Sequence, residues 1–363
     1  MRQIPGLMVL LLLVLPPAPV SAQQSEPLYK TPYRVINVHR HGSPPSAAAA
    51  QAELEVFDRV GMDVAVILDG RWTGNGLAEW LALRDKHRDR IALFANLNFE
   101  LAKQPGFSEA IVKELVEQHR LGVQGIKFFK GFGMTARDGS GKLIAIDDPR
   151  LDAYFEKCGE LGLPVLIHSA DPREYWYPRT YNSDHYGRTD RAKHWEDPQM
   201  PKWEELIRQR NNLLAKHPKT IFIGAHFGSL TYDLQQLAET LDKYPNFYVE
   251  SSARLRILGR LNPVAVRDFF VKYQDRILFG TDSSILGGAD PKDAAAVQAW
   301  KDGAARFYSR HFQYFETSRS DLMEPYGYEG EWLRLAGAKL PAEVLEKFYH
   351  ANAEKLIPGL KKN

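Results

Sequence analysis

The chain has 363 residues, of which 44% are hydrophobic and 25% are charged, and its formal net charge at pH 7 is +2. This composition is ordinary for a globular protein with a sizeable core, and the small net charge, without a basic run interleaved with aromatic residues, excludes a dedicated nucleic-acid binder. Cys158 is the only cysteine, which excludes an internal disulfide and a cysteine-rich metal site. Any metal must therefore be held by nitrogen and oxygen.

The N-terminus has the order of features found in a secretory signal. Arg2 is followed by an almost wholly apolar run, Gly6–Leu15, and Val20-Ser21-Ala22 then places small residues where a signal peptidase would cut. The apolar run is too short for a membrane span of roughly 20 residues. We therefore expect residues 1–22 to be a signal peptide, the mature chain 23–363 to be one domain without a membrane anchor, and the protein to be periplasmic or secreted.

Eight short apolar, β-branched runs recur along the rest of the chain. They are Val35–Val38, Val64–Leu68, Ile91–Leu97, Gly125–Phe129, Pro164–Ile167, Thr220–Gly224, Phe247–Val249 and Ile277–Phe279. The amphipathic segments between them are Ala48–Val60, Gly76–His87, Ser108–Leu121, Pro149–Leu161, Trp203–His217, Tyr232–Lys243 and Pro263–Tyr273. Strands that alternate with helices indicate parallel β-α units, and eight such units close a (β/α)₈ (TIM) barrel.

Two stretches interrupt this rhythm. Ser169–Lys202, after the fifth strand, reads as a long loop, and Gly287–Leu340, after the eighth, reads as a second irregular region. Long loops in compact domains usually cover or line a site, so we expect both insertions at the C-terminal rim of the barrel. The rival fold, a doubly wound open sheet, would normally have a Gly-rich phosphate loop after the first strand. His39-Arg40-His41-Gly42 stands there instead, which favours the barrel.

Four of the eleven histidines and one aspartate stand at the C-terminal ends of predicted strands. His39 and His41 end the first, His168 the fifth and His226 the sixth, and Asp282 follows the eighth. A single histidine after a strand is more often a hydrogen-bonded structural residue than a ligand. All strand C-termini of a barrel share one face, however, so these five side chains converge, and two residues of a strand that are two apart point to the same side. Imidazoles with one carboxylate suit zinc, and manganese, iron or cobalt are tolerable.

At this point the sequence resembles the amidohydrolase superfamily, in particular amidohydrolase family 2, which includes aminocarboxymuconate semialdehyde decarboxylase-like enzymes and lactone hydrolases. The resemblance covers residues 34–357. It is carried by Val38-His39-Arg40-His41, Gly125-Ile126-Lys127, Pro164-Val165-Leu166-Ile167-His168, Ile223-Gly224-Ala225-His226, Leu278-Phe279-Gly280-Thr281-Asp282 and Ala351-Asn352-Ala353. These motifs are specific to the superfamily but not to a substrate.

The resemblance implies one divalent metal ion, with His39, His41, His168 and Asp282 as its ligands. It also implies that His226 is a catalytic group outside the ligand set. A metal ion lowers the pKa of a bound water and polarises a carbonyl, and Asp282 beside that water is the expected general base. His226 is expected to stabilise the oxyanion or to orient the water.

Three cationic side chains are candidates for binding an anionic substrate. Lys127 and Lys130 close the fourth strand, and only one of the two is expected to face the barrel mouth; pairing with an acid, or carboxylation to bridge two metals, are the alternatives. Arg254, just past the seventh strand, is expected either to clamp the substrate or to form a salt bridge at the rim.

The expected function is hydrolysis of an amide, ester or lactone bond in a small, anionic substrate. Non-oxidative decarboxylation on the same metal frame is the alternative, and an exported binding protein without catalysis is the third reading. No motif separates the first two. The expected partners are a small-molecule substrate and neither nucleic acid nor membrane, with homo-oligomerisation left open.

Overall fold

The computed structural model of the chain describes residues 27–42, 46–178, 192–284, 286, 290–323 and 334–361. The predicted signal peptide, residues 1–22, lies outside the described residues, and so does the middle of the long loop after the fifth strand, residues 179–191. In the part of the chain that is described, no helix is both long enough and apolar enough to span a membrane.

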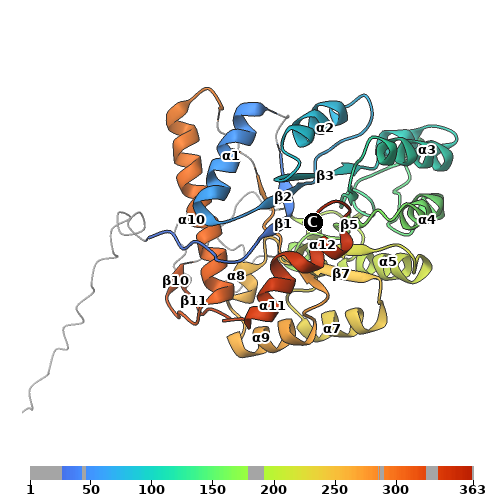
Figure 1. Cartoon of the computed structure of the whole chain (residues 1–363). Helices are drawn as coiled ribbons and strands as arrows, with labels where there is room; N and C mark the ends of the chain where they lie inside the picture. Colours follow the sequence, from blue (N-terminus) through green and yellow to red (C-terminus); the bar gives the residue numbers. More distant parts are fainter. Residues whose placement is uncertain are drawn as a thin grey trace, which may run out of the picture.

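The eight predicted strands are all present and lie in sequence order in one parallel sheet, which confirms the predicted barrel (Figure 1). They are β1 (Ile36–His41), β2 (Val64–Ile67), β3 (Ile91–Asn96), β4 (Gly125–Phe128), β5 (Val165–Ile167), β6 (Phe222–Gly224), β7 (Phe247–Glu250) and β8 (Ile277–Leu278). Each strand pairs in parallel with the next, so the C-terminal ends of all eight lie at the same rim.

The segment that continues β8 closes the ring against the first strand. Val38 donates its N–H to the carbonyl of Phe279 at 2.9 Å, and the short strand β9 (Ser283–Ser284) pairs in parallel with the end of β1. An open doubly wound sheet would leave these two edges apart. The hydrogen bonds across the β1–β8 seam therefore favour the closed barrel over the rival fold.

β1 contains a register shift between Asn37 and Arg40. Val38 packs in the inner core of the barrel, and the next residue, His39, contributes its side chain to the mouth. Arg40 then turns outward and pairs with Glu53 of the first helix. A bulge of this kind redirects side chains without breaking the strand, so it aims both His39 and His41 into the mouth.

Most of the helices lie in the outer layer of the barrel, and the last one fills the N-terminal end of the strand ring. They are α1 (Ala47–Val60), α2 (Leu77–Lys86), α3 (Phe107–Arg120), α4 (Asp152–Glu160), α5 (Trp203–Lys216), α7 (Leu234–Lys243), α9 (Pro263–Lys272), α10 (Ala294–Glu316) and α11 (Ala342–Glu346), with the shorter α6 (Ala225–Gly228), α8 (Leu255–Leu258) and α12 (Asn352–Leu356). In α3 the buried residues Phe107, Ile111 and Leu115 recur every four positions, which places them in one stripe against the strands.

The prediction that Gly287–Leu340 is irregular is wrong for much of its length, because α10 occupies 23 residues of it. In Figure 1 α10 (orange) runs beside α1 (blue), on the outside of the barrel, and ion pairs from Arg59 to Asp302 and from Lys301 to Glu55 join the two helices. Only the second half of α10 has a continuous buried face, and the exposed Gly303 interrupts its middle. Apolar periodicity over its whole length is therefore weak. A small antiparallel pair, β10 (Leu322–Met323) and β11 (Arg334–Leu335), follows.

Two apolar layers hold the fold together, one inside the strand ring and one between strands and helices. The inner layer is made by Ile36, Val38, Val64, Val66, Leu68, Ala92, Phe94, Leu166, Ile223, Ala225, Tyr248 and Leu278, together with Ala353, Ile357 and Leu360 of the C-terminal segment. Asn352 of α12 also donates to the carbonyl of Ile277 at 2.8 Å. The N-terminal end of the ring is thus filled by α12 and the residues after it, and the mouth at the C-terminal end is left for polar side chains.

Candidate metal centre and active site

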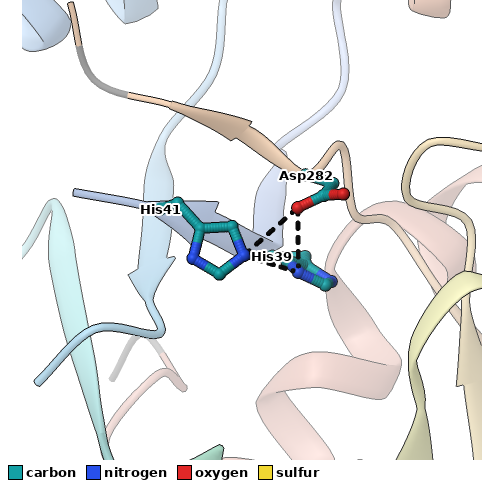
Figure 2. A group of neighbouring side chains, drawn as sticks. All are labelled: His39, His41 and Asp282. Carbon is teal, nitrogen blue, oxygen red and sulfur yellow. Dashed lines mark hydrogen bonds and ion pairs between the residues drawn. The ribbon is translucent and has the colours of Figure 1, made fainter. Parts of the chain in front are cut away.

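Three of the predicted site residues converge at the β1–β8 seam (Figure 2). The Nε2 atoms of His39 and His41 lie 3.2 Å apart, and Asp282 Oδ1 lies 3.3 Å from His39 Nε2 and 3.2 Å from His41 Nε2. His39 is fully buried, while His41 and Asp282 retain some exposure. The C-terminal ends of β1 and β8 therefore bring these three side chains to one point, as the sequence predicts.

Asp282 reaches this point through an uncommon backbone conformation. Its φ is +58°, in the left-handed region, and its N–H donates to the carbonyl of His39 at 2.9 Å. The preceding Gly280 allows the strand to pass close to the site, since a Cβ there would lie 2.2 Å from Glu250 Oε2. A side chain at position 280 would displace the Glu250 carboxylate.

Two carboxylates orient the imidazoles of β1 from behind. Glu250, at the end of β7, accepts a hydrogen bond from His39 Nδ1 at 2.9 Å, and Asp69, just after β2, accepts one from His41 Nδ1 at 2.9 Å. The Nδ1 atoms therefore carry the protons, and both Nε2 lone pairs face Asp282. Such outer carboxylates fix the tautomer and raise the basicity of histidine ligands.

These contacts leave an electron-rich gap between three donor atoms. Burial lowers the pKa of His41, but hydrogen bonds to Asp282 and Asp69 outweigh it and raise that pKa overall. Burial would raise the pKa of Asp282, but the electrostatic interaction with His39 and the close contacts of its carboxylate with both histidines hold that pKa well below its usual value. The cluster thus favours a positive charge in the gap, which a divalent cation would supply.

His168, the fourth predicted ligand, lies beside this cluster rather than within it. Its ring is 4.5 Å from the ring of His226, and its buried Nε2 has no hydrogen-bond partner among the described residues. Burial holds the pKa of His168 well below its usual value, so the imidazole is neutral. A buried imidazole nitrogen without a partner is costly, and a metal ligand role would satisfy it.

His226 follows β6 and has a different environment at each ring nitrogen. Its Nδ1 donates to the Ser252 carbonyl at 2.9 Å, and its Nε2 lies 3.9 Å from Asp282 Oδ2. Burial and the nearby charge of Arg254 lower the pKa of His226 to about 3. The side chain is therefore neutral, with an Nε2 lone pair that faces the Asp282 carboxylate.

The donor set fits a metal ion. Donor atoms of His39, His41 and Asp282 all lie within 4.8 Å of one another, and a second group of the same kind is formed by His39, His226 and Glu250. In the second group the Glu250 carboxylate accepts hydrogen bonds from His39 Nδ1 and from the His226 N–H, so it forms a supporting layer. The first group, with His168 nearby, offers the nitrogen and oxygen ligands that zinc, manganese, iron or cobalt accept.

Lys127 and Lys130 have separate environments, as expected for two residues of which one faces the mouth. Lys127 is buried with its Nζ 3.4 Å from His39 Nε2, and burial lowers the pKa of Lys127 to about 8. Lys130 is half-exposed and forms an ion pair with Asp171 of the long loop, which also accepts a hydrogen bond from His194 at 2.9 Å. Lys127 is thus the lysine that reaches the His–Asp cluster.

Arg254 is buried beside the site and donates to the carbonyl of Ala253 at 2.9 Å. Among the described residues no carboxylate lies within ion-pair distance of its guanidinium, so the rim salt bridge considered from the sequence is not seen there. Its charge acts on His226 instead, as the lowered pKa of that histidine indicates.

Three residues of the site, Asp69, Glu250 and Ser252, were not among those predicted from the sequence. Ser252 Oγ donates to Glu250 Oε1 at 2.7 Å and lies 2.9 Å from His226 Nδ1, so it joins the two buried histidine environments. Asp69 and Glu250 stand at the ends of β2 and β7. The strand-end rule that selected the histidines would have selected them as well, had it been applied to every carboxylate.

Comparisons with known proteins show the family and the fold. The amidohydrolase family model matches residues 36–359. An uncharacterised TIM-barrel protein of Bordetella bronchiseptica superposes with a TM-score of 0.53 at 14% identity, covering 89% of this chain and 98% of its own. The IDCase of Metarhizium anisopliae, in apo form, superposes with a TM-score of 0.52 at 15% identity, covering 92% and 99%. At these identities the two structures show the fold alone. The search of curated proteins found no significant match.

The family match spans nearly all of the described barrel and includes every strand-end residue discussed above. Members of this family are metal-dependent hydrolases or decarboxylases. The chain belongs to amidohydrolase family 2.

Proposed function

We propose that the protein is a metal-dependent hydrolase that cleaves a C–N or C–O bond, in an amide, ester or lactone, of a small anionic substrate. The observation that carries the proposal is the gap between His39 Nε2, His41 Nε2 and Asp282 Oδ1. Three electron-pair donors within 3.3 Å of one another, with the ring protons on the far nitrogens, form a site that needs a cation.

His39, His41, His168 and Asp282 would hold the metal in this proposal. When bound, a divalent ion polarises a substrate carbonyl and makes a water acidic. Asp282, ionised in the buried cluster, accepts the proton of the attacking water and later returns it to the leaving group. His226 is neutral and unprotonated at Nε2, so it orients that water by accepting a hydrogen bond.

Two buried cations would select the substrate. Lys127 and Arg254 lie on different sides of the cluster, Lys127 beside His39 and Arg254 beside His226. A carboxylate or a polarised oxygen on the substrate would pair with them, above all with Arg254, which has no carboxylate within ion-pair distance among the described residues. This arrangement supports an anionic substrate.

Decarboxylation is the second candidate, because the same cations would bind a carboxylate that leaves as CO₂. The decisive experiment loads the purified protein with zinc or manganese and offers it lactones, amides and aromatic carboxylates, with CO₂ release scored separately. Hydrolysis without CO₂ release, lost on chelation and restored by metal, supports the proposal. CO₂ release supports the lyase, and binding without turnover supports the non-catalytic reading.

A further inference from the structure

A chain of buried polar side chains lies behind the β1–β8 seam, on the side away from the metal cluster. It runs from Asn37 in β1 through Thr281 and Ser283, on either side of Asp282, to Tyr308 in α10. Asn37, Thr281 and Tyr308 are essentially buried. Buried polar groups in a seam between apolar layers are retained only where their hydrogen bonds are satisfied.

The hydrogen bonds of this chain start at the Asn37 amide and continue through three hydroxyl groups. Asn37 Nδ2 donates to Thr281 Oγ1 at 2.7 Å, while Asn37 Oδ1 accepts from the N–H groups of His39 and Thr281, both at 3.2 Å. The Thr281 hydroxyl also lies 2.7 Å from Ser283 Oγ, and Ser283 Oγ lies 3.1 Å from the Tyr308 hydroxyl, with either oxygen of each pair able to donate. One amide thus binds the backbone on both sides of the seam.

Asp282 lies between the two hydroxyl residues in a conformation that a non-glycine residue adopts at a cost. Its N–H donates to the His39 carbonyl, and the next two residues, Ser283 and Ser284, pair with the end of β1. We propose that the chain Asn37–Thr281–Ser283–Tyr308 is a positioning device, which holds Asp282 in its left-handed conformation with its carboxylate facing His39 and His41. The role in metal binding rests on the proposed function.

The test replaces the Thr281 hydroxyl by a methyl group of the same size, in Thr281→Val. The matched control is Thr220→Val, because Thr220 is equally buried and donates its hydroxyl to the Phe155 carbonyl at 2.7 Å, at the opposite end of the barrel. Thr281→Val loses two buried hydrogen bonds, with Asn37 Nδ2 and with Ser283 Oγ, and Thr220→Val loses one, so both should lose thermal stability and Thr281→Val the more. Only Thr281→Val should disturb the metal cluster.

The readouts are the affinity for Co²⁺ in competition with a chelator, the visible absorption of the Co²⁺ protein, and a crystal structure of the metal-free variant. We expect Thr281→Val to weaken Co²⁺ binding about 10- to 100-fold and to change the absorption band. Thr220→Val should leave the Co²⁺ affinity and the absorption band near native. Thr281→Ser, which keeps the hydroxyl, should restore the native affinity and the native band. The crystal structure should show Asp282 displaced from His39. If Thr281→Val does not fold, Ser283→Ala, which breaks the chain one residue later, should give the same effects with smaller magnitude.

Native affinity and absorption in the folded variant, or an unmoved Asp282 in its crystal structure, would overturn the proposal. The crystal structure decides the matter even if the native protein binds no metal. Failure of the hydrolase proposal would leave these readouts unaffected, because none of them depends on turnover.

Discussion

At the scale of single residues, the histidines of the site differ in the group that their Nδ1 atom contacts. His39 and His41 direct Nδ1 to carboxylates and Nε2 into the cluster, whereas His226 directs Nδ1 to a backbone carbonyl. Histidines that bind a metal donate their other ring N–H to a carboxylate, a backbone carbonyl or water. The division into ligands and a non-ligand, which the family resemblance implies, stays a prediction.

Replacing His226 by Asn tests this division. The Asn amide can still donate to the Ser252 carbonyl, so the metal content should stay near native while kcat falls by about 10²- to 10⁴-fold, the usual worth of one acid–base or orienting group. Elemental analysis and steady-state kinetics measure the two effects. Asp282→Asn is the contrasting variant and should lower both kcat and metal retention. Loss of metal from His226→Asn would place His226 among the ligands.

At the scale of elements, α10 takes the place of a barrel helix that the sequence did not predict. Its second half is buried against the seam strands and includes His311, which donates from Nδ1 to the Phe307 carbonyl at 2.8 Å. Burial lowers the pKa of His311 to about 4. His311 therefore stays neutral in the folded protein at pH values where it is protonated in the unfolded chain.

This buried histidine should make stability depend on pH. In the unfolded chain His311 has a pKa near 6.5, so below that pH the unfolded chain binds more protons than the folded one. The contribution of neutral His311 to the free energy of unfolding is therefore fully present above pH 6.5 and is lost as the pH falls toward 4. Between pH 8 and pH 5 the free energy of unfolding should fall by about 2 kcal/mol more in the native protein than in His311→Gln. Urea unfolding at both pH values measures the difference. His119→Gln, at an exposed position in α3, is the control and should keep the native dependence; equal slopes in all three proteins would refute the prediction.

At the scale of the whole molecule, the barrel separates stability from chemistry along its axis. α12 and Leu360 fill the N-terminal end with apolar side chains, and the ionisable groups collect at the other end. This separation lets the mouth carry buried charges while the inner core remains apolar. Active sites of barrel enzymes lie at this C-terminal end for the same reason.

Export remains a prediction about the whole chain. The order of charge, apolar run and small residues in positions 1–22 predicts that the mature protein begins at Gln23. Mass spectrometry of protein recovered from the periplasm or medium should give the mass of residues 23–363. Ala22→Asp should block cleavage and leave the longer chain. An intact Met1 in exported native protein would remove the signal-peptide prediction.

The sequence by itself determined the eight strands and the convergence of the ligand candidates. Periodic apolar runs are local, and the barrel rule then places all strand ends on one rim, so His39 and Asp282 could be brought together from positions far apart. The local signal failed for α10, whose first half is exposed and whose buried face exists only against α1 and the seam.

Only the tertiary structure decided how the site is held. The bulge in β1, the carboxylates of Asp69 and Glu250 behind the imidazoles, and the amide of Asn37 across the seam all depend on which strands are neighbours and in what register. A carboxylate has the same local sequence signature whether it faces water or a histidine. Its role is fixed by distances between strands, and those exist only once the barrel closes.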